Sequence, residues 1–124
     1  MKPRLTQEAL VFRALAHPVR VAILETVRRR PVCVCHLAAV LDCPQAYISQ
    51  QLATLRRAGL IEGHKDGAFV YYKARDYSIL GMIDLVTRYL GRVPGDASTG
   101  ADRVEGCACP ECSGEATPAK GARG

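Results

Sequence analysis

The chain of 124 residues has no long hydrophobic run. No stretch approaches the roughly eighteen apolar residues that a bilayer-spanning helix needs, and residues 1–7 have charge but no apolar run of the kind found in secretory leaders. We therefore expect a soluble, cytoplasmic protein with no membrane among its partners. The sequence also lacks a Ser/His/Asp set, a phosphate-binding loop, paired carboxylates and internal repeats, so we expect no enzyme and no organic cofactor.

Six cysteines are the most unusual feature of what is present. In a reducing cytoplasm a disulfide framework explains them poorly, and metal binding or redox chemistry explains them better. Charge is the second feature: the formal net charge is +5, and residues 1–90 carry 13 Lys and Arg against 7 Asp and Glu. A basic surface of this kind favours a polyanionic partner through counterion release. Charge alone, however, more often indicates a basic surface that only contacts solvent.

Hydrophobic spacing predicts a mainly α-helical chain. The predicted helices span residues 5–16, 18 to about 30, 32–41, 44–58 and 77–90. Asp66-Gly67 lies between strand-like runs at residues 60–65 and 68–73, which predicts a β-hairpin. A short turn joins the third and fourth helices, so the fold class that we predict is a winged helix-turn-helix in which the hairpin is the wing.

The chain divides by composition near residue 90. A domain this small has a modest core, and the apolar residues of the first and last predicted helices exceed what one copy can cover, which predicts a homodimer. Seven glycines occur in residues 91–124. We therefore predict a DNA-binding and dimerisation domain at residues 1–90 and a flexible, cysteine-containing Gly/Pro-rich tail at residues 91–124.

Four segments of the first ninety residues carry a resemblance to a known family. They are FRALAHPVR at residues 12–20, CVCHL at 33–37, ISQQL at 48–52 and LRRAGL at 55–60. In this order and spacing they resemble the ArsR/SmtB family of winged-helix metal-sensing repressors. The resemblance implies a homodimer that binds double-stranded operator DNA without inducer and releases it when a metal or metalloid binds.

The fourth predicted helix has a polar face that is free to enter a DNA groove. Glutamine can bond adenine with two hydrogen bonds, whereas Lys and Arg fix the register on phosphates. For base edges we expect Gln45, Ser49 and Gln50, and for phosphates Arg56, Arg57 and Lys65, with Arg20 as a weaker candidate. The family usually has a small hydroxyl residue where this chain has Ala46 and often a basic one at Gln50 or Gln51, which leaves the base preference open.

Cys33 and Cys35 flank a single residue at the start of the third predicted helix. In a regular helix, residues two apart point about 200° from each other around the axis, so their two sulfurs cannot hold one ion. In an extended segment they share a side. Metal binding at this pair therefore requires the start of the helix to be non-helical or to become so, and any strain would reach the fourth helix across a short turn.

Two sulfurs do not complete a metal site, because cadmium, lead and zinc usually take four donors and trivalent arsenic takes three. The candidate ligands are Cys33, Cys35, Cys107, Cys109 and Cys112. Some similar sensors complete the helical pair with cysteines from an N-terminal arm. In this chain that arm has no cysteine, so we expect the tail to take that role in cis or in trans. Alternatively, the tail binds its own ion.

The sequence leaves the inducer open. We favour arsenite, with cadmium or lead next, because the thiols suit soft ions and the last predicted helix lacks the histidines that related zinc sensors use. The alternative is a redox- or persulfide-sensing repressor that uses the same cysteines. A weaker third hypothesis takes Cys109-Pro110-Glu111-Cys112 as a thiol-disulfide oxidoreductase motif, but that motif does not start a helix after a strand. Cys43 is interpreted as a packed small residue.

Overall fold

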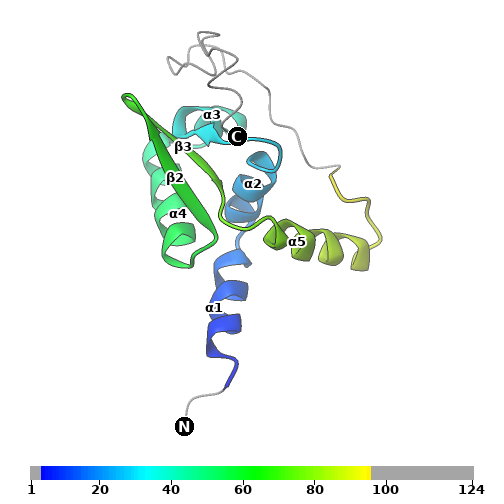
Figure 1. Cartoon of the computed structure of the whole chain (residues 1–124). Coiled ribbons are helices and arrows are strands. Elements are labelled where there is room, and N and C mark those ends of the chain that lie inside the picture. The colour runs from blue at the N-terminus through cyan, green and yellow to red at the C-terminus, as the bar shows by residue number, and fades with distance from the viewer. Residues whose placement is uncertain (1–3, 96–124) are drawn as a thin grey trace.

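The computed structural model describes residues 4–95 (Figure 1). Residues 1–3 and 96–124 lie outside the described range. The elements are α1 (Thr6–Leu15), α2 (Pro18–Thr26), β1 (Val32–Cys33), α3 (Val34–Val40), α4 (Gln45–Arg57), β2 (Ile61–Asp66), β3 (Phe69–Ala74) and α5 (Ser78–Tyr89). No helix of the described range is long and apolar enough to cross a membrane.

The strands form one antiparallel sheet in the order β1-β3-β2. β2 and β3 make the predicted hairpin, whose last pair is Asp66 with Phe69, and Gly67 adopts the positive φ of +63° that this tight turn needs. α3 and α4 meet at a turn in which Asp42 has a φ of +52°, a conformation that Asp tolerates better than most residues. The predicted fold class, a winged helix-turn-helix that is mainly α, is therefore confirmed.

Two of the predicted boundaries were wrong, both near the start of the third helix. α2 ends at Thr26, not near residue 30, and Val32 and Cys33 form a strand and not the first turn of a helix. β1 pairs with β3, so that Val32 faces Tyr72 and Cys33 faces Tyr71. A two-residue strand has no hydrophobic period of its own, and its partner is almost forty residues away, so sequence periodicity could not reveal it.

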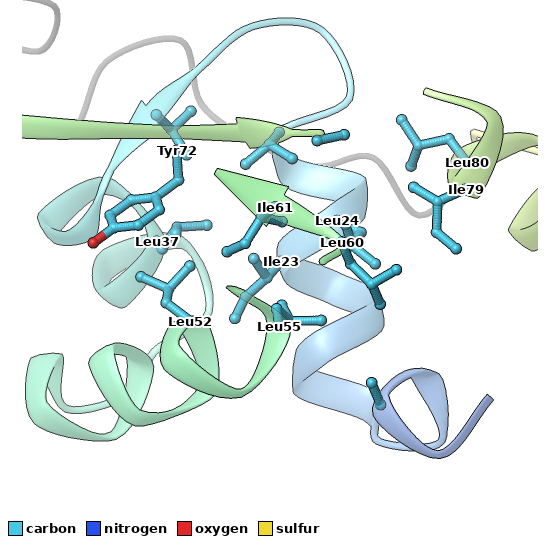
Figure 2. Close-up of a cluster of buried hydrophobic side chains, with 14 of the residues drawn as sticks. Ile23, Leu24, Leu37, Leu52, Leu55, Leu60, Ile61, Tyr72, Ile79 and Leu80 are labelled. Atoms are coloured by element: carbon cyan, nitrogen blue, oxygen red, sulfur yellow. The ribbon is translucent and has the colours of Figure 1, made fainter. Parts of the chain in front are cut away.

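The core lies between α2, α3, α4 and the base of the sheet. Figure 2 shows Ile23 and Leu24 of α2 among side chains from α4 and the strands. The largest fully buried side chains are Ile23, Leu24, Val27, Leu37, Ile48, Leu52 and Leu55. Each such side chain contributes roughly 1.5–3 kcal/mol by leaving water. This burial fixes one face of α4 against the protein and leaves its opposite face in solvent.

α1 and α5 carry an apolar surface that the described chain leaves exposed. Its members are Leu5, Leu10, Phe12, Leu85, Val86, Tyr89, Leu90 and Val93. Phe12, Met82, Ile83 and Val86 are among the residues that line a cavity of about 480 Å³ in this surface. Figure 1 shows α1 and α5 extending away from the rest of the fold. Exposed apolar surfaces of this kind occur at protein–protein contacts and in ligand-binding grooves.

An ion network holds α5 to α2 beneath this surface. Arg28 donates to Glu25 at 2.7 Å and to Asp84 of α5 at 2.7 Å. The hydrogen bonds that Arg28 donates to both carboxylates, with Glu25 as the larger cause, raise the pKa of Arg28, and the hydrogen bond from Arg28 lowers the pKa of Asp84. The network therefore links the position of α5 to the helix at the centre of the core.

Candidate functional site

The helix α4 presents a polar face. Ile48, Leu52 and Leu55 are buried on the other side, and this amphipathic spacing orients the helix. All six residues predicted to contact DNA are exposed: Gln45, Ser49, Gln50, Arg56, Arg57 and Lys65. Five of them lie on α4, and Lys65 lies on β2 of the wing. The structure thus gathers the predicted base-contacting residues on one solvent-facing helix, next to the hairpin.

Two polar contacts fix α4 onto the start of α2. The first is the hydrogen bond from Nε of Arg20 to Oε1 of Gln51 at 2.9 Å, and the second joins His17 to Tyr47 of α4. Nη1 of Arg20 also donates to the carbonyl of Ala14 in α1 at 3.3 Å. His17 caps α2, because its Nδ1 accepts from the Val19 amide at 3.2 Å. An accepting Nδ1 leaves the ring proton on Nε2, which lies 3.3 Å from the Tyr47 hydroxyl.

The sequence alone did not predict that Arg20 and Gln51 anchor α4. Arg20 was a weaker candidate for a phosphate contact, whereas the structure gives it two internal hydrogen bonds. Gln51 was one of two adjacent glutamines, and the structure buries it. The only sequence signal that separates Gln51 from Gln50 is its place three residues after Ile48 and four before Leu55, on the buried side of the helix.

A second cavity separates α4 from the wing. Its volume is about 480 Å³, and Arg56, Lys65 and Tyr72 are among its lining residues. Glu62 also lines it, but its carboxylate accepts from His64 at 3.2 Å and lies 3.7 Å from Nζ of Lys73. The hydrogen bond from His64 is the main cause of the lowered pKa of Glu62. Arg56 and Lys65 thus place two positive charges between the helix and the wing.

The predicted thiol pair lies where β1 passes into α3. Cys33 caps α3 with extended backbone angles, φ −86° and ψ 168°, and Cys35 follows inside the helix. Because only Cys35 is helical, the two sulfurs do not point apart, and their Sγ atoms lie 2.9 Å from each other. The non-helical start that metal binding at this pair requires is therefore already present.

The thiol pair is in direct contact with the wing. Cys33 is only 3% exposed and packs with Tyr71 of β3, which is 2% exposed, while Cys35 and Phe69 pack against the two. Cys33 is also the strand partner of Tyr71. Tyr71 was not singled out from the sequence, because its role depends on the pairing of β1 with β3.

The oxidation state differs between the described cysteines. Cys33 and Cys43 are thiols, whereas Cys35 is disulfide-bonded. Cys43 packs against the core and its thiol donates to the carbonyl of Leu41 at 3.3 Å. Residues 4–95 contain no cluster of three or more side chains able to hold a metal. The predicted tail ligands Cys107, Cys109 and Cys112 lie outside the described residues. The described part of the site therefore contributes two sulfurs, of which that of Cys35 must be reduced before it can bind an ion.

The family model described as "Bacterial regulatory protein, arsR family" matches residues 17–62, which run from the cap of α2 to the second residue of β2. The chain is 37% identical over 73 residues to the HTH-type transcriptional repressor SmtB of Mycobacterium tuberculosis, which is 59% of this chain and 54% of that repressor. It is 33% identical over 75 residues to the cadmium resistance transcriptional regulatory protein CadC of Listeria innocua, which is 60% of this chain and 63% of that protein. The matches thus span little more than half of these relatives.

Two solved structures are similar over most of the described range. The crystal structure of Rv0081 from M. tuberculosis superposes with a TM-score of 0.68 at 30% identity, covering 73% of this chain and 92% of that one. The solution structure of the homodimeric winged helix-turn-helix domain of Mb0332 from Mycobacterium bovis has a TM-score of 0.66 at 26% identity, covering 70% and 81%. The fold and the site define a winged-helix regulator. The chain belongs to the ArsR family of bacterial transcriptional regulators.

Proposed function

We propose that this protein is a cytoplasmic transcriptional repressor that binds operator DNA as a homodimer and is released by a thiophilic metal or metalloid. Arsenite is the inducer that we favour, with cadmium or lead as the alternatives. One observation carries the proposal: the sulfurs of Cys33 and Cys35 converge at a junction that contacts both the wing and, through α3, the exposed helix α4. SmtB and CadC, two relatives, are a transcriptional repressor and a cadmium resistance regulator by name.

DNA binding is assigned to α4 and the wing. We propose that Gln45, Ser49 and Gln50 read base edges in a major groove, while Arg56, Arg57 and Lys65 contact phosphates. Their exposure supports this, and so does the burial of the opposite helix face, which prevents α4 from rotating. The exposed apolar surface of α1 and α5 supports a homodimer, in which two copies of α4 would address two half-sites.

Inducer binding would reach the DNA-binding surface by a short route. Cys33 belongs to β1, which pairs with β3, and its side chain packs on Tyr71 of β3. β3 in turn forms the hairpin with β2, the strand that carries Lys65. An ion held by the two sulfurs would draw them into its own coordination geometry and so change how Cys33 packs against Tyr71. Because Cys33 is already extended, α3 need not unwind, and the wing is the element that would move.

The ligand set is completed in the proposal by Cys107, Cys109 and Cys112 of the tail, which we assign to residues 91–124, outside the winged domain at residues 1–90. Sulfur is the donor type that a soft ion prefers, but two sulfurs are fewer donors than such an ion usually takes. One or two further thiolates would give arsenite its three donors, or cadmium or lead its four. The thiolates supply tight binding of a soft ion, while the junction between β1 and α3 supplies its effect on the wing.

Operator binding measured by fluorescence anisotropy, with and without arsenite, cadmium or lead under reducing conditions, tests the proposal. We expect an inducer to weaken binding roughly ten- to hundredfold, in the usual range of allosteric coupling. Cys33→Ser and Cys35→Ser should each bind DNA normally and lose this response. Cys43→Ser is the matched control, because a serine hydroxyl can also donate to the Leu41 carbonyl. DNA binding that ignores all three ions would remove the sensing function.

A second candidate function, redox sensing, is favoured by the disulfide at Cys35 beside the thiol of Cys33. Two thiols that form a disulfide give two protons and two electrons to a peroxide, which is reduced to water. Mass spectrometry of the reduced and peroxide-treated protein, with DNA binding measured on the same samples, separates the candidates. A peroxide-dependent, dithiothreitol-reversible loss of DNA binding without any metal supports redox sensing, and unchanged binding excludes it.

A further inference from the structure

A third cavity, of about 390 Å³, lies between α1 and α4, and Arg57 is the only one of its lining residues that the function proposed above uses. Arg13 of α1, Arg20 of α2 and Arg57 of α4 line it together with Thr54. Its other lining residues are Leu10, Ala14 and Ala58, so no acidic side chain contributes to its wall. Three helices therefore bring three guanidinium groups to one cavity.

Arg20 and Arg57 donate hydrogen bonds to neutral groups. Arg20 donates to the amide oxygen of Gln51 and to the carbonyl of Ala14, and Nη2 of Arg57 donates to the Thr54 hydroxyl at 3.3 Å. Within residues 4–95, none of the three forms an ion pair with a carboxylate, in contrast to Arg28, which lies between Glu25 and Asp84. Like charges gathered without a counterion repel, and the fork of an arginine matches the oxygens of a phosphate.

The cavity lies on the flank of α4 opposite the wing. Arg57 and Thr54 face α1 and α2, whereas Arg56, one residue away and about 100° around the helix, lines the wing-side cavity with Lys65. The exposed polar face lies between these flanks. A helix in the major groove has a phosphate backbone on each side, because the two strands form the walls of the groove. Both flanks of α4 therefore carry positive charge where a phosphate strand would run.

We propose that the cavity lined by Arg13, Arg20 and Arg57 binds a backbone phosphate of the operator, on the DNA strand opposite the one met by the wing. The inference rests on the proposed DNA binding and extends it to α1, which supplies Arg13. The two hydrogen bonds of Arg20 hold its guanidinium in place, so Arg13 and Arg57 close around the phosphate from the solvent side. The contact is independent of sequence, since only phosphate oxygens are involved.

Salt-dependent DNA binding of single variants tests this assignment. The probes are a duplex selected by the wild-type protein from a random pool, and a shuffled duplex of equal length. Arg13→Gln should lower the slope of log affinity against log salt by about 1.8, because each of the two copies of the dimer loses one phosphate contact worth about 0.9. Affinity for both duplexes should fall about 25-fold, which corresponds to about 2 kcal/mol. Arg57→Gln should behave alike, and Arg13→Lys should keep the wild-type slope because it keeps the charge.

Arg29→Gln is the matched control, because Arg29 is an exposed arginine in the turn after α2 and does not line the cavity, so the slope should be unchanged. An unchanged slope in Arg13→Gln would overturn the inference while leaving DNA binding by α4 intact. If the wild-type protein selected no duplex at all, the proposed function itself would fail. Titration with inorganic phosphate separates a DNA phosphate from a free phosphate ion. If inorganic phosphate binds in an Arg13-dependent way while the salt slope of DNA binding is unchanged in Arg13→Gln, the cavity binds a free anion and the operator contact is overturned.

Discussion

The contact between Arg20 and Gln51 should be worth a measurable part of the stability of the domain. The Arg20 guanidinium donates to the Gln51 side chain at 2.9 Å, and Gln51 is only 9% exposed. Removing Arg20 leaves a buried amide oxygen without its donor. We therefore predict that Arg20→Met and Gln51→Leu destabilise the protein and that the two changes are not additive.

The magnitude follows from the chemistry and the burial of this contact. A hydrogen bond from a charged donor contributes roughly 1.5–3 kcal/mol, and partial exposure of Arg20 places this one at the lower end. The coupling free energy in a double-mutant cycle should therefore be about 1.5 kcal/mol. Arg20→Met alone should cost more than the coupling, because it also removes the donor to the Ala14 carbonyl.

Urea unfolding of the wild type, both single variants and the double variant supplies the cycle. Protein concentration is held constant, because the proposed dimer would make apparent stability depend on it. Gln50→Leu combined with Arg20→Met is the control pair, since Gln50 neighbours Gln51 but is exposed, and its coupling should be close to zero. A coupling below about 0.5 kcal/mol for Arg20 and Gln51, equal to that of the control pair, would refute the assignment of Arg20 to anchoring α4.

Three further predictions concern the dimer surface, the ion network and the wing. Val86→Glu, at a side chain 57% exposed on α5, should convert the dimer to monomers in light scattering, because it places an unpaired charge in an apolar contact. The stabilisation from Asp84 should be complete above its ordinary pKa of about 3.8 and be lost as the pH falls through its lowered native pKa. Arg28→Gln should flatten this acid dependence in urea unfolding. Gly67→Ala should cost about 1–2 kcal/mol in the same measurement through backbone strain alone, because φ is +63° and no atom lies within 4 Å of the added Cβ.

Local sequence patterns predicted the elements that have a period or a turn of their own. The amphipathic spacing of Ile48, Leu52 and Leu55 predicted α4 and its buried face, and Asp66-Gly67 predicted the hairpin of the wing. The exposure of the predicted DNA-contacting residues followed from the same spacing, since a helix with one buried face leaves the opposite one in solvent.

The sequence by itself thus determined the helices, the wing and the identity of the thiols at the start of α3, because these depend on residues close together in the chain. Only the tertiary structure decided what Cys33 touches and which polar residues anchor α4. The pairing of β1 with β3 joins residues almost forty positions apart, and it turned the expected first helical turn into a strand that packs on Tyr71. The contact between Arg20 and Gln51 joins residues 31 positions apart. Contacts of such separation leave no periodic trace in the sequence, since each depends on how complete helices and strands pack together.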